Sequence, residues 1–216
     1  MDQNHDRNNN NNNKRQRFES DKSDINSIIT SLKICAKQKS LEKGCRIHAS
    51  IVKKGFLIEK DAFIGNALLN MYTKCGALSK AQEVFDTLHT RDVISWTALI
   101  DGYVEYGNGK EALNCFEIMQ LEGVSPDAIT FICALKACGR IGASHEGQEI
   151  HSEIMKQGLL KRNIIVGNAL VDMYAKCGNI AKAQLVFDEL PNKDVVSWNS
   201  LMKGYAQYGN GEEAVK

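Results

Sequence analysis

The 216-residue sequence predicts an all-α protein, an α-solenoid built from stacked helix–turn–helix repeats. Three observations lead to this fold class. Apolar residues recur at helical spacing, glycines separate consecutive helical runs, and the second half of the chain repeats the first. The composition, 43% hydrophobic and 25% charged, is typical of a globular protein, and no apolar run approaches the length of a membrane span.

Helical spacing is clearest between residues 62 and 121. Apolar residues three and four positions apart form two runs, Leu68–Tyr72 and Ala81–Leu88. Gly76 lies between the runs, where a residue in the left-handed conformation would end the first helix. The same arrangement recurs further along the chain as Leu99–Tyr103, Gly107 and Ala112–Met119. Each unit is thus a helix pair, and such a pair buries its apolar faces only when neighbouring pairs stack on it.

The chain also contains an internal repeat with a period of 102 residues. Residues 62–114 align with residues 164–216 without a gap, and 29 of the 53 aligned positions are identical. The residues that precede these two blocks also match each other, at a shift of 103 residues. Duplication over this length indicates a larger unit made of several helix pairs.

The first 24 residues differ from the rest in composition. They contain six consecutive asparagines, Asn8–Asn13, and a single aromatic residue, Phe18, so we expect a disordered tail at 1–24. The tail lacks the apolar stretch of a signal peptide, and its five acidic residues do not fit an organelle transit peptide. The basic run KRQR at residues 14–17 fits a solvated tail better than a nucleic-acid patch.

Three segments narrow the kind of helical repeat. MYTKCGALSKAQEVFD, DVISWTALIDGYVEYGNGKEAL and EGVSPDAITFICALKACGRIG resemble the pentatricopeptide repeat (PPR) family. More narrowly, they resemble its plant-type PLS subclass, in which long, short and standard repeats alternate. The resemblance covers residues 25–216 and implies a right-handed α-solenoid.

The boundaries of that family divide the chain into six units. Three consecutive units have lengths that add to the observed period of 102 residues. We expect a fragment without a C-terminal extension, because the last unit stops inside its second helix. The units are a long repeat at 25–61, a short repeat at 62–92, a standard repeat at 93–127, a long repeat at 128–163, a short repeat at 164–194 and a truncated standard repeat at 195–216.

The resemblance implies that such repeats bind single-stranded RNA, one base per repeat, through a few side chains. The selecting residues in the family are the fifth and the last of each repeat. The residues at these positions are Asn66 with Asp92 (uracil), Thr97 with Asp127 (guanine), Asn168 with Asp194 (uracil), and Asn199 without a partner (a pyrimidine). The long units depart from the pattern, with Ile29 and Asp61 in one and Ile132 and Asn163 in the other. The expected register from 5′ to 3′ is N-U-G-N-U-Y.

Each of these polar residues also has a structural interpretation. Asn66 and Asn168 follow a glycine near a helix start, where an asparagine can serve as N-cap. Asp92, Asp127 and Asp194 lie between helices, where capping and contact with RNA are compatible. Base contact is favoured for the asparagines because Asn199 occupies the same repeat position without a preceding glycine.

Other recurring residues do not indicate catalysis. The cysteine pairs Cys35 and Cys138, and Cys75 and Cys177, fit small buried core residues better than nucleophiles or metal ligands. His48 and His151 recur in the second helix of each long unit and fit structural or partner-facing roles. Trp96 and Trp198 precede the fifth position, where core packing is favoured over base stacking.

The predicted function is a sequence-selective RNA-binding adaptor in organellar RNA processing or editing. We expect no enzymatic activity, because the zinc deaminase motifs that some relatives carry are absent. We also expect no cofactor, no metal and no small-molecule substrate, and the lack of a long apolar run predicts no membrane partner. The expected partners are single-stranded RNA and a separate editing or processing enzyme. The family resemblance implies a mitochondrion or chloroplast. The alternative is a peptide-binding scaffold, which the near-neutral charge of +1 keeps open.

Overall fold

The computed structural model describes residues 24–55 and 62–208, and these form helices and turns without a strand. The predicted all-α class is therefore confirmed. The chain divides into two compact units, residues 1–90 and residues 91–216. Within the described ranges, no helix combines the length and the apolar character that crossing a bilayer requires.

The predicted disordered tail lies almost entirely outside the described residues. Asp24 belongs instead to a helix over residues 24–38, and its Oδ2 lies 3.3 Å from Lys54 Nζ. The prediction of disorder is therefore wrong at Asp24.

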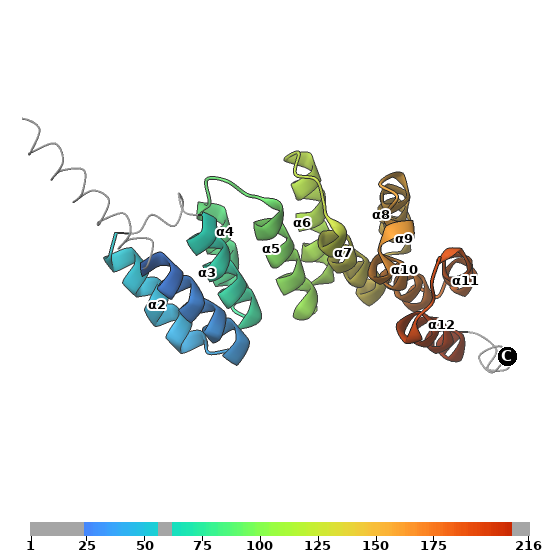
Figure 1. The fold of residues 1–216 in the computed structure, drawn as a ribbon, viewed down its shortest axis with the longest axis horizontal. Coiled ribbons are helices and arrows are strands. Elements are labelled where there is room, and N and C mark those ends of the chain that lie inside the picture. Colours follow the sequence, from blue (N-terminus) through green and yellow to red (C-terminus); the bar gives the residue numbers. More distant parts are fainter. Residues whose placement is uncertain (1–23, 56–61, 209–216) are drawn as a thin grey trace, which may run out of the picture. The chain divides into compact units, whose positions relative to one another are not determined.

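The described residues of the first unit form two helix pairs. The helix over residues 24–38 is followed by α2 (Leu41–Lys53), and α3 (Ala62–Lys74) is followed by α4 (Leu78–Thr87). Helix α3 packs against both α2 and α4, so it lies at the centre of the unit (Figure 1).

A glycine ends α3, as the spacing of apolar residues predicts. Gly76 adopts φ 75°, and the N–H of the following residue, Ala77, donates to the carbonyl of Tyr72 at 3.0 Å. A left-handed residue followed by such a backward hydrogen bond is the usual end of a helix. The chain therefore reverses here, and α4 returns along α3.

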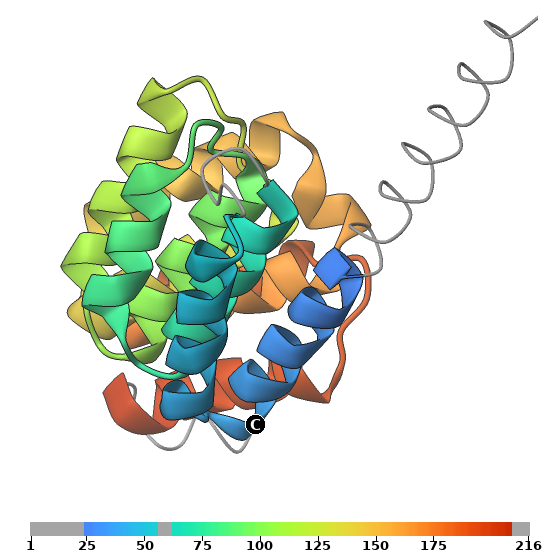
Figure 2. The same cartoon turned by 90° about the vertical axis from the view of Figure 1, so that its left-hand side faces the viewer.

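Among its described residues, the second unit contains three helix pairs, the short helix α9 and a last helix, α12. Each second helix packs against the first helix of its own pair and against the first helix of the next pair. The first helices, α5, α7, α10 and α12, lie side by side in chain order (Figures 1 and 2). The helices are α5 (Val93–Glu105), α6 (Gly109–Leu121), α7 (Ala128–Ile141), α8 (Ser144–Lys156), the short α9 (Leu159–Arg162), α10 (Ile164–Lys176), α11 (Ile180–Glu189) and α12 (Val195–Tyr208).

The core of the second unit lies between these two rows of helices. Leu99, Phe131, Leu135 and Leu170 are fully buried. The Phe131 ring packs against the Phe116 ring of α6, with 6.0 Å between the ring centroids. Each such side chain contributes about 1.5–3 kcal/mol by leaving water. A helix pair alone has no place to bury these faces, so stacking of successive pairs stabilises the fold.

Five first helices begin at the first residue of a predicted repeat, at Ala62, Val93, Ala128, Ile164 and Val195. The alternation of long, short and standard repeats stays a prediction, as does the right-handed twist of the solenoid. Helix α9 adds a turn within residues 128–163 that the spacing of apolar residues does not predict.

Candidate nucleic-acid interface

The polar fifth residues lie inside the first helices and are not helix caps. Asn66 is the fifth residue of α3, Thr97 of α5, Asn168 of α10 and Asn199 of α12. An N-cap residue precedes the first helical residue, so the capping interpretation of Asn66 and Asn168 is wrong. Because α5, α7, α10 and α12 lie side by side, their fifth residues occur at equivalent points along the second unit.

The aspartates at the ends of the repeats do act as caps. Asp92 precedes α5 and accepts a hydrogen bond from Ser95 N–H at 2.8 Å. Asp127 precedes α7 and forms a capping box with Thr130. Asp194 accepts from Ser197 N–H at 2.8 Å, and this bond is the largest of the contributions that lower the pKa of its carboxyl group. These carboxylates are therefore held at fixed positions beside the first helices.

Thr97 is joined to the next repeat by a chain of hydrogen bonds. Its Oγ1 lies 2.6 Å from Thr130 Oγ1, and Thr130 Oγ1 donates to Asp127 Oδ1 at 2.8 Å. Thr97 is half-buried and Thr130 is fully buried. The fifth residue, the last residue and the third residue of the following repeat thus form one connected trio.

An equivalent trio surrounds Asn168. Its Nδ2 donates to Asp194 Oδ1 at 3.0 Å, and its Oδ1 accepts from Ser197 Oγ at 2.5 Å. Asn168 is only 6% exposed, more deeply buried than a residue predicted to face a base. One amide N–H and one lone pair stay outside these bonds, so contact with a ligand is confined to the small exposed part of the amide.

A row of exposed apolar residues is a feature that the sequence analysis missed. The second residue of five predicted repeats is apolar and 55–78% exposed. An isolated exposed apolar residue is ordinary, but recurrence at one repeat position indicates a shared role. Recurrence at this spacing is the signal that would have revealed them. The residues are Phe63, Ile94, Ile129, Ile165 and Val196.

The fifth residues of the long repeats have no polar group. Ile29 and Ile132 are both half-buried. Asp61, the expected partner of Ile29, lies outside the described residues. Asn163, the expected partner of Ile132, is the N-cap of α10 and accepts from Ile165 N–H at 3.0 Å. A base-specific contact from these two units is not supported.

The two tryptophans at one repeat position differ in their surroundings. Trp96 is 2% exposed and belongs to the core, as the sequence predicts. Trp198 is 50% exposed, so the prediction of a core residue is wrong for this position. One side of its ring packs on Phe187, with 4.7 Å between the ring centroids.

The cysteines are poorly suited to nucleophilic chemistry or metal binding. Cys35 and Cys138 are buried as predicted, whereas Cys75 and Cys177 are only half-buried. Burial raises the pKa of the Cys75 and Cys177 thiols, and raises the pKa of Cys138 to about 12. Thiols of this kind are inert because the thiolate is the reactive form. Within the described ranges, no cluster of three or more His, Cys, Asp or Glu side chains could hold a metal ion.

The recurring histidines form structural hydrogen bonds. His48 Nδ1 lies 2.8 Å from the Tyr72 hydroxyl, and His151 Nδ1 lies 2.9 Å from the Tyr174 hydroxyl. Burial lowers the pKa of both imidazoles, which favours their neutral form. These pairs join α2 to α3 and α8 to α10. The structural role predicted for both histidines agrees with this geometry.

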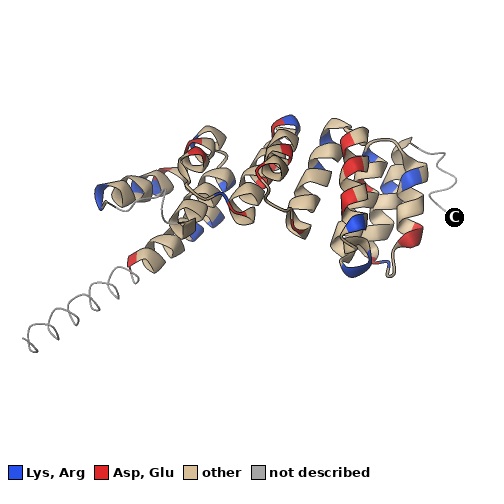
Figure 3. Cartoon of the chain, turned by 90° about the horizontal axis from the view of Figure 1, so that it is seen from above, with Lys and Arg blue, Asp and Glu red and all other residues tan. Residues whose placement is uncertain are grey.

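Charge on the molecule is mixed. Acidic and basic residues occur on helices of both units (Figure 3). Two lysines of the second unit are engaged with neighbouring side chains. Lys176 Nζ lies 2.6 Å from Asp172 Oδ2, and Lys182 Nζ donates to Gln148 Oε1 at 2.6 Å. Counterion release from such a surface would add little to binding of a polyanion.

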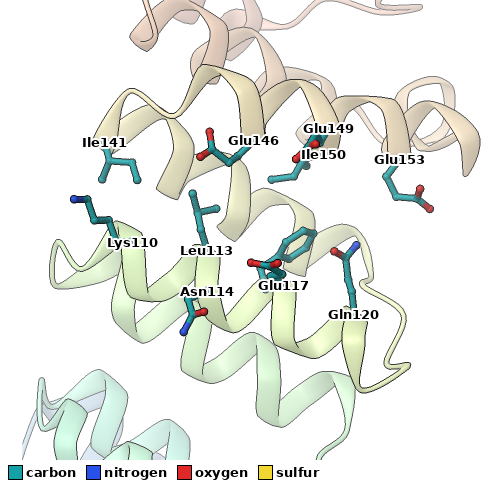
Figure 4. A pocket seen from close by; sticks show the side chains of 11 residues that line it. Lys110, Leu113, Asn114, Glu117, Gln120, Ile141, Glu146, Glu149, Ile150 and Glu153 are labelled. Carbon is teal, nitrogen blue, oxygen red and sulfur yellow. The ribbon is translucent and has the colours of Figure 1, made fainter.

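A groove of about 610 Å³ lies between α6 and α8 in the second unit (Figure 4). Its apolar floor includes Leu113, Phe116 and Ile150. Four carboxylates line the groove around this floor, and Lys110 is the basic residue among the lining side chains. A polyanion would be repelled here, so the groove is not the candidate nucleic-acid surface. The carboxylates belong to Glu117, Glu146, Glu149 and Glu153.

Stacked helix pairs, with a hydrogen-bonded trio recurring on their first helices, define a helical-repeat protein. Residues 91–140 match the PPR repeat family, and residues 66–93, 168–195 and 196–216 each match the PPR repeat. The chain therefore belongs to the pentatricopeptide repeat family. The predicted family is confirmed, and its plant-type subclass stays a prediction.

Relatives in Arabidopsis thaliana have the same family name. A chloroplastic pentatricopeptide repeat-containing protein is 35% identical over 189 residues, which are 88% of this chain and 30% of the relative. A mitochondrial one is 41% identical over 184 residues, which are 85% of this chain and 18% of the relative. This chain spans about a third or less of the length of the curated relatives it matches.

Solved structures share the fold. Maize PPR10 has a TM-score of 0.59 at 20% identity, covering 81% of this chain and 26% of that chain. PPR10 was also solved with an 18-nt psaJ RNA element, at a TM-score of 0.53 and 18% identity, covering 87% of this chain and 33% of that chain. The PPR domain of Arabidopsis thaliana protein-only RNase P 1, solved with tRNA, has a TM-score of 0.61 at 14% identity, covering 82% of this chain and 96% of that domain.

Proposed function

We propose that the chain is a sequence-selective module that binds single-stranded RNA. In this proposal each repeat contacts one base, and the module directs a separate processing or editing activity to organellar transcripts. The relatives described above include one named chloroplastic and one named mitochondrial. The solved PPR10 complex contains an RNA element, and the PPR domain of protein-only RNase P 1 was solved with tRNA.

One observation carries the proposal. The fifth residue of a repeat is held by the aspartate of its own repeat and by the third residue of the next, at both Thr97 and Asn168. A short polar side chain in a fixed orientation can discriminate bases, because base edges differ in their donors and acceptors. Half-buried Thr97 retains some exposed surface for such a contact.

The exposed apolar residues supply the second part of a base site. Ile94 and Ile129 are the second residues of consecutive repeats on α5 and α7, which lie side by side. A base between them would pack its faces on aliphatic carbon while its edge meets Thr97. Each base contact of this kind contributes roughly 1–3 kcal/mol. With about three selecting units, we expect micromolar or weaker affinity for this chain alone.

The proposed register is N-U-G-N-U-Y from 5′ to 3′, with uracil at Asn66, guanine at Thr97, uracil at Asn168 and a pyrimidine at Asn199. The test is fluorescence anisotropy with labelled RNA of this register and with a shuffled RNA of equal composition. Alanine at Asn66, Thr97 and Asn168 should weaken binding of the register RNA at least tenfold. Equal binding of the two RNAs by the unsubstituted chain would refute the proposal.

A matched control separates base contact from general damage. Asn114→Ala removes an exposed amide from α6, a second helix, and should leave RNA binding unchanged. Circular dichroism should show the same helicity for all variants, so that a loss of binding reports on the interface.

The acidic groove favours one alternative function, which is binding of a basic peptide. Its apolar floor and four glutamates suit a segment that carries both apolar and basic side chains. If the triple alanine variant retained RNA binding and Glu146→Lys abolished binding of a Lys- and Arg-rich peptide, this function would replace the first.

A further inference from the structure

We propose that Thr130, the third residue of the repeat after Thr97, is a positioning residue that fixes the hydrogen-bonding character Thr97 offers to a base. The inference rests on the proposed function, because it concerns how the same position selects its base. Thr130 is fully buried, so its effect on a ligand must pass through Thr97.

The protons in the trio can be assigned by counting. Thr130 has one hydroxyl proton, and Thr130 Oγ1 donates it to Asp127 Oδ1 at 2.8 Å, since an ionised carboxylate only accepts. The contact between Thr97 Oγ1 and Thr130 Oγ1 at 2.6 Å also requires a proton. That proton must come from Thr97, because the proton of Thr130 is already used.

Donation toward Thr130 decides what Thr97 presents on its open side. The hydroxyl proton points back into the protein, and the two lone pairs that Thr97 Oγ1 retains make it an acceptor. The purine bases differ at ring nitrogen N1, where guanine has an N–H donor and adenine has a lone pair. An acceptor at Thr97 therefore suits guanine and opposes the N1 lone pair of adenine.

The same device at Asn168 has a different result. Ser197, also fully buried, has one hydroxyl proton and two nearby acceptors, Asn168 Oδ1 at 2.5 Å and Asp194 Oδ1 at 3.0 Å. Because the same Asp194 oxygen already accepts from Asn168 Nδ2 at 3.0 Å, whereas Asn168 Oδ1 can meet the Ser197 hydroxyl only as an acceptor, the proton goes to Asn168 Oδ1. The two partners hold the amide in one orientation, with one N–H and one lone pair remaining in a fixed order. Uracil and cytosine have the donor and the acceptor of their pairing edges in opposite order, so a fixed amide distinguishes them.

The decisive variant is Thr130→Val, which keeps the branched shape and removes the hydroxyl. The Asp127 carboxylate still caps Thr130 N–H, at 2.8 Å, so we expect the helix start to persist. Thr97 is then free to turn its proton outward and donate to adenine N1. Binding of RNA with adenosine at the third register position should tighten about five- to tenfold, while binding of the guanosine RNA changes about twofold or less.

Two further variants test the role of the hydroxyl itself. Thr130→Ser restores a hydroxyl and should restore the preference for guanosine. Ser95→Ala removes a buried hydroxyl at the same repeat position, where it donates to the Asp92 carbonyl at 2.8 Å, and should leave the preference unchanged. General destabilisation would weaken binding of both RNAs and would not tighten binding of the adenosine RNA.

The outcomes separate this inference from the proposed function. If the unsubstituted chain bound guanosine and adenosine RNA equally, the base selectivity of the proposed function would fail. If it preferred guanosine and folded Thr130→Val kept the same preference, the positioning role would be overturned. Should the Thr130 variants not fold, Ser197→Ala gives a second test. It should reduce the preference for uridine over cytidine at the fifth register position about fivefold or more, and an unchanged preference would overturn the inference.

Discussion

The two tryptophans at one repeat position give a sharp test of the stacking of helix pairs. Replacing Trp96 with alanine removes a side chain that is 98% buried, given its exposure of 2%. Large-to-small changes of this kind cost about 3–5 kcal/mol, because lost transfer free energy and an internal cavity add together. We expect Trp96→Ala to lower the free energy of unfolding of the second unit by this amount.

Trp198→Ala is the matched variant. Half of this side chain already contacts water. We therefore expect Trp198→Ala to lower the free energy of unfolding by about half as much as Trp96→Ala, roughly 1.5–2.5 kcal/mol. The contact with the Phe187 ring accounts for about 0.5–1.5 kcal/mol of this value. The two variants should therefore differ by about 2 kcal/mol.

The assay is urea unfolding followed by far-ultraviolet circular dichroism, because each variant removes one of the two tryptophans and so changes the fluorescence signal itself. A lower midpoint at an unchanged slope would report a change of stability without a change in the surface exposed on unfolding. If Trp96→Ala and Trp198→Ala lowered the free energy of unfolding equally, the assignment of Trp96 to the core and of Trp198 to a half-exposed position would be refuted.

Three further predictions concern stability. First, burial lowers the pKa values of His48 and His151, so their stabilising contribution is present above the unfolded value of about 6.5 and is lost as the pH falls through the lower folded value. Urea midpoints measured at several pH values should show this slope, and glutamine at both positions should reduce it. Second, Gly142→Ala places a side chain at φ 71° and should cost about 1–2 kcal/mol in thermal or urea unfolding, with a smaller loss for Gly142→Asn. Third, Asp127→Ala removes the N-cap of α7 and should cost about 1–2 kcal/mol in the same measurement, and an unchanged stability would contradict the capping role.

The repeated helix pairs could be predicted from the sequence because their signals are local. Apolar spacing and Gly76 place the end of α3, and the internal repeat places the equivalent end of α10. Helix formation depends mainly on residues within a few turns, so these signals survive without knowledge of the neighbours. The family resemblance supplied the fifth and last positions, and the structure joins them by hydrogen bonds at Asn168 and Asp194.

Exposure of individual side chains could not be predicted in the same way. Trp96 and Trp198 have the same place in the internal repeat, yet one is buried and the other is half-exposed. The difference depends on which helices pack against α5 and against α12. Asn168 is buried because Asp194 and Ser197 enclose its amide. Both residues lie more than 25 positions further along the chain.

The sequence alone determines that this chain forms helix pairs, how often they recur, and which repeat position has a polar side chain. The tertiary structure decides how that side chain is oriented and where its protons point. The physical reason is that a helix follows from short-range contacts along the chain. The direction of the hydrogen bond at Thr97 depends instead on residues about 30 positions away, Asp127 at the end of its own repeat and Thr130 in the next.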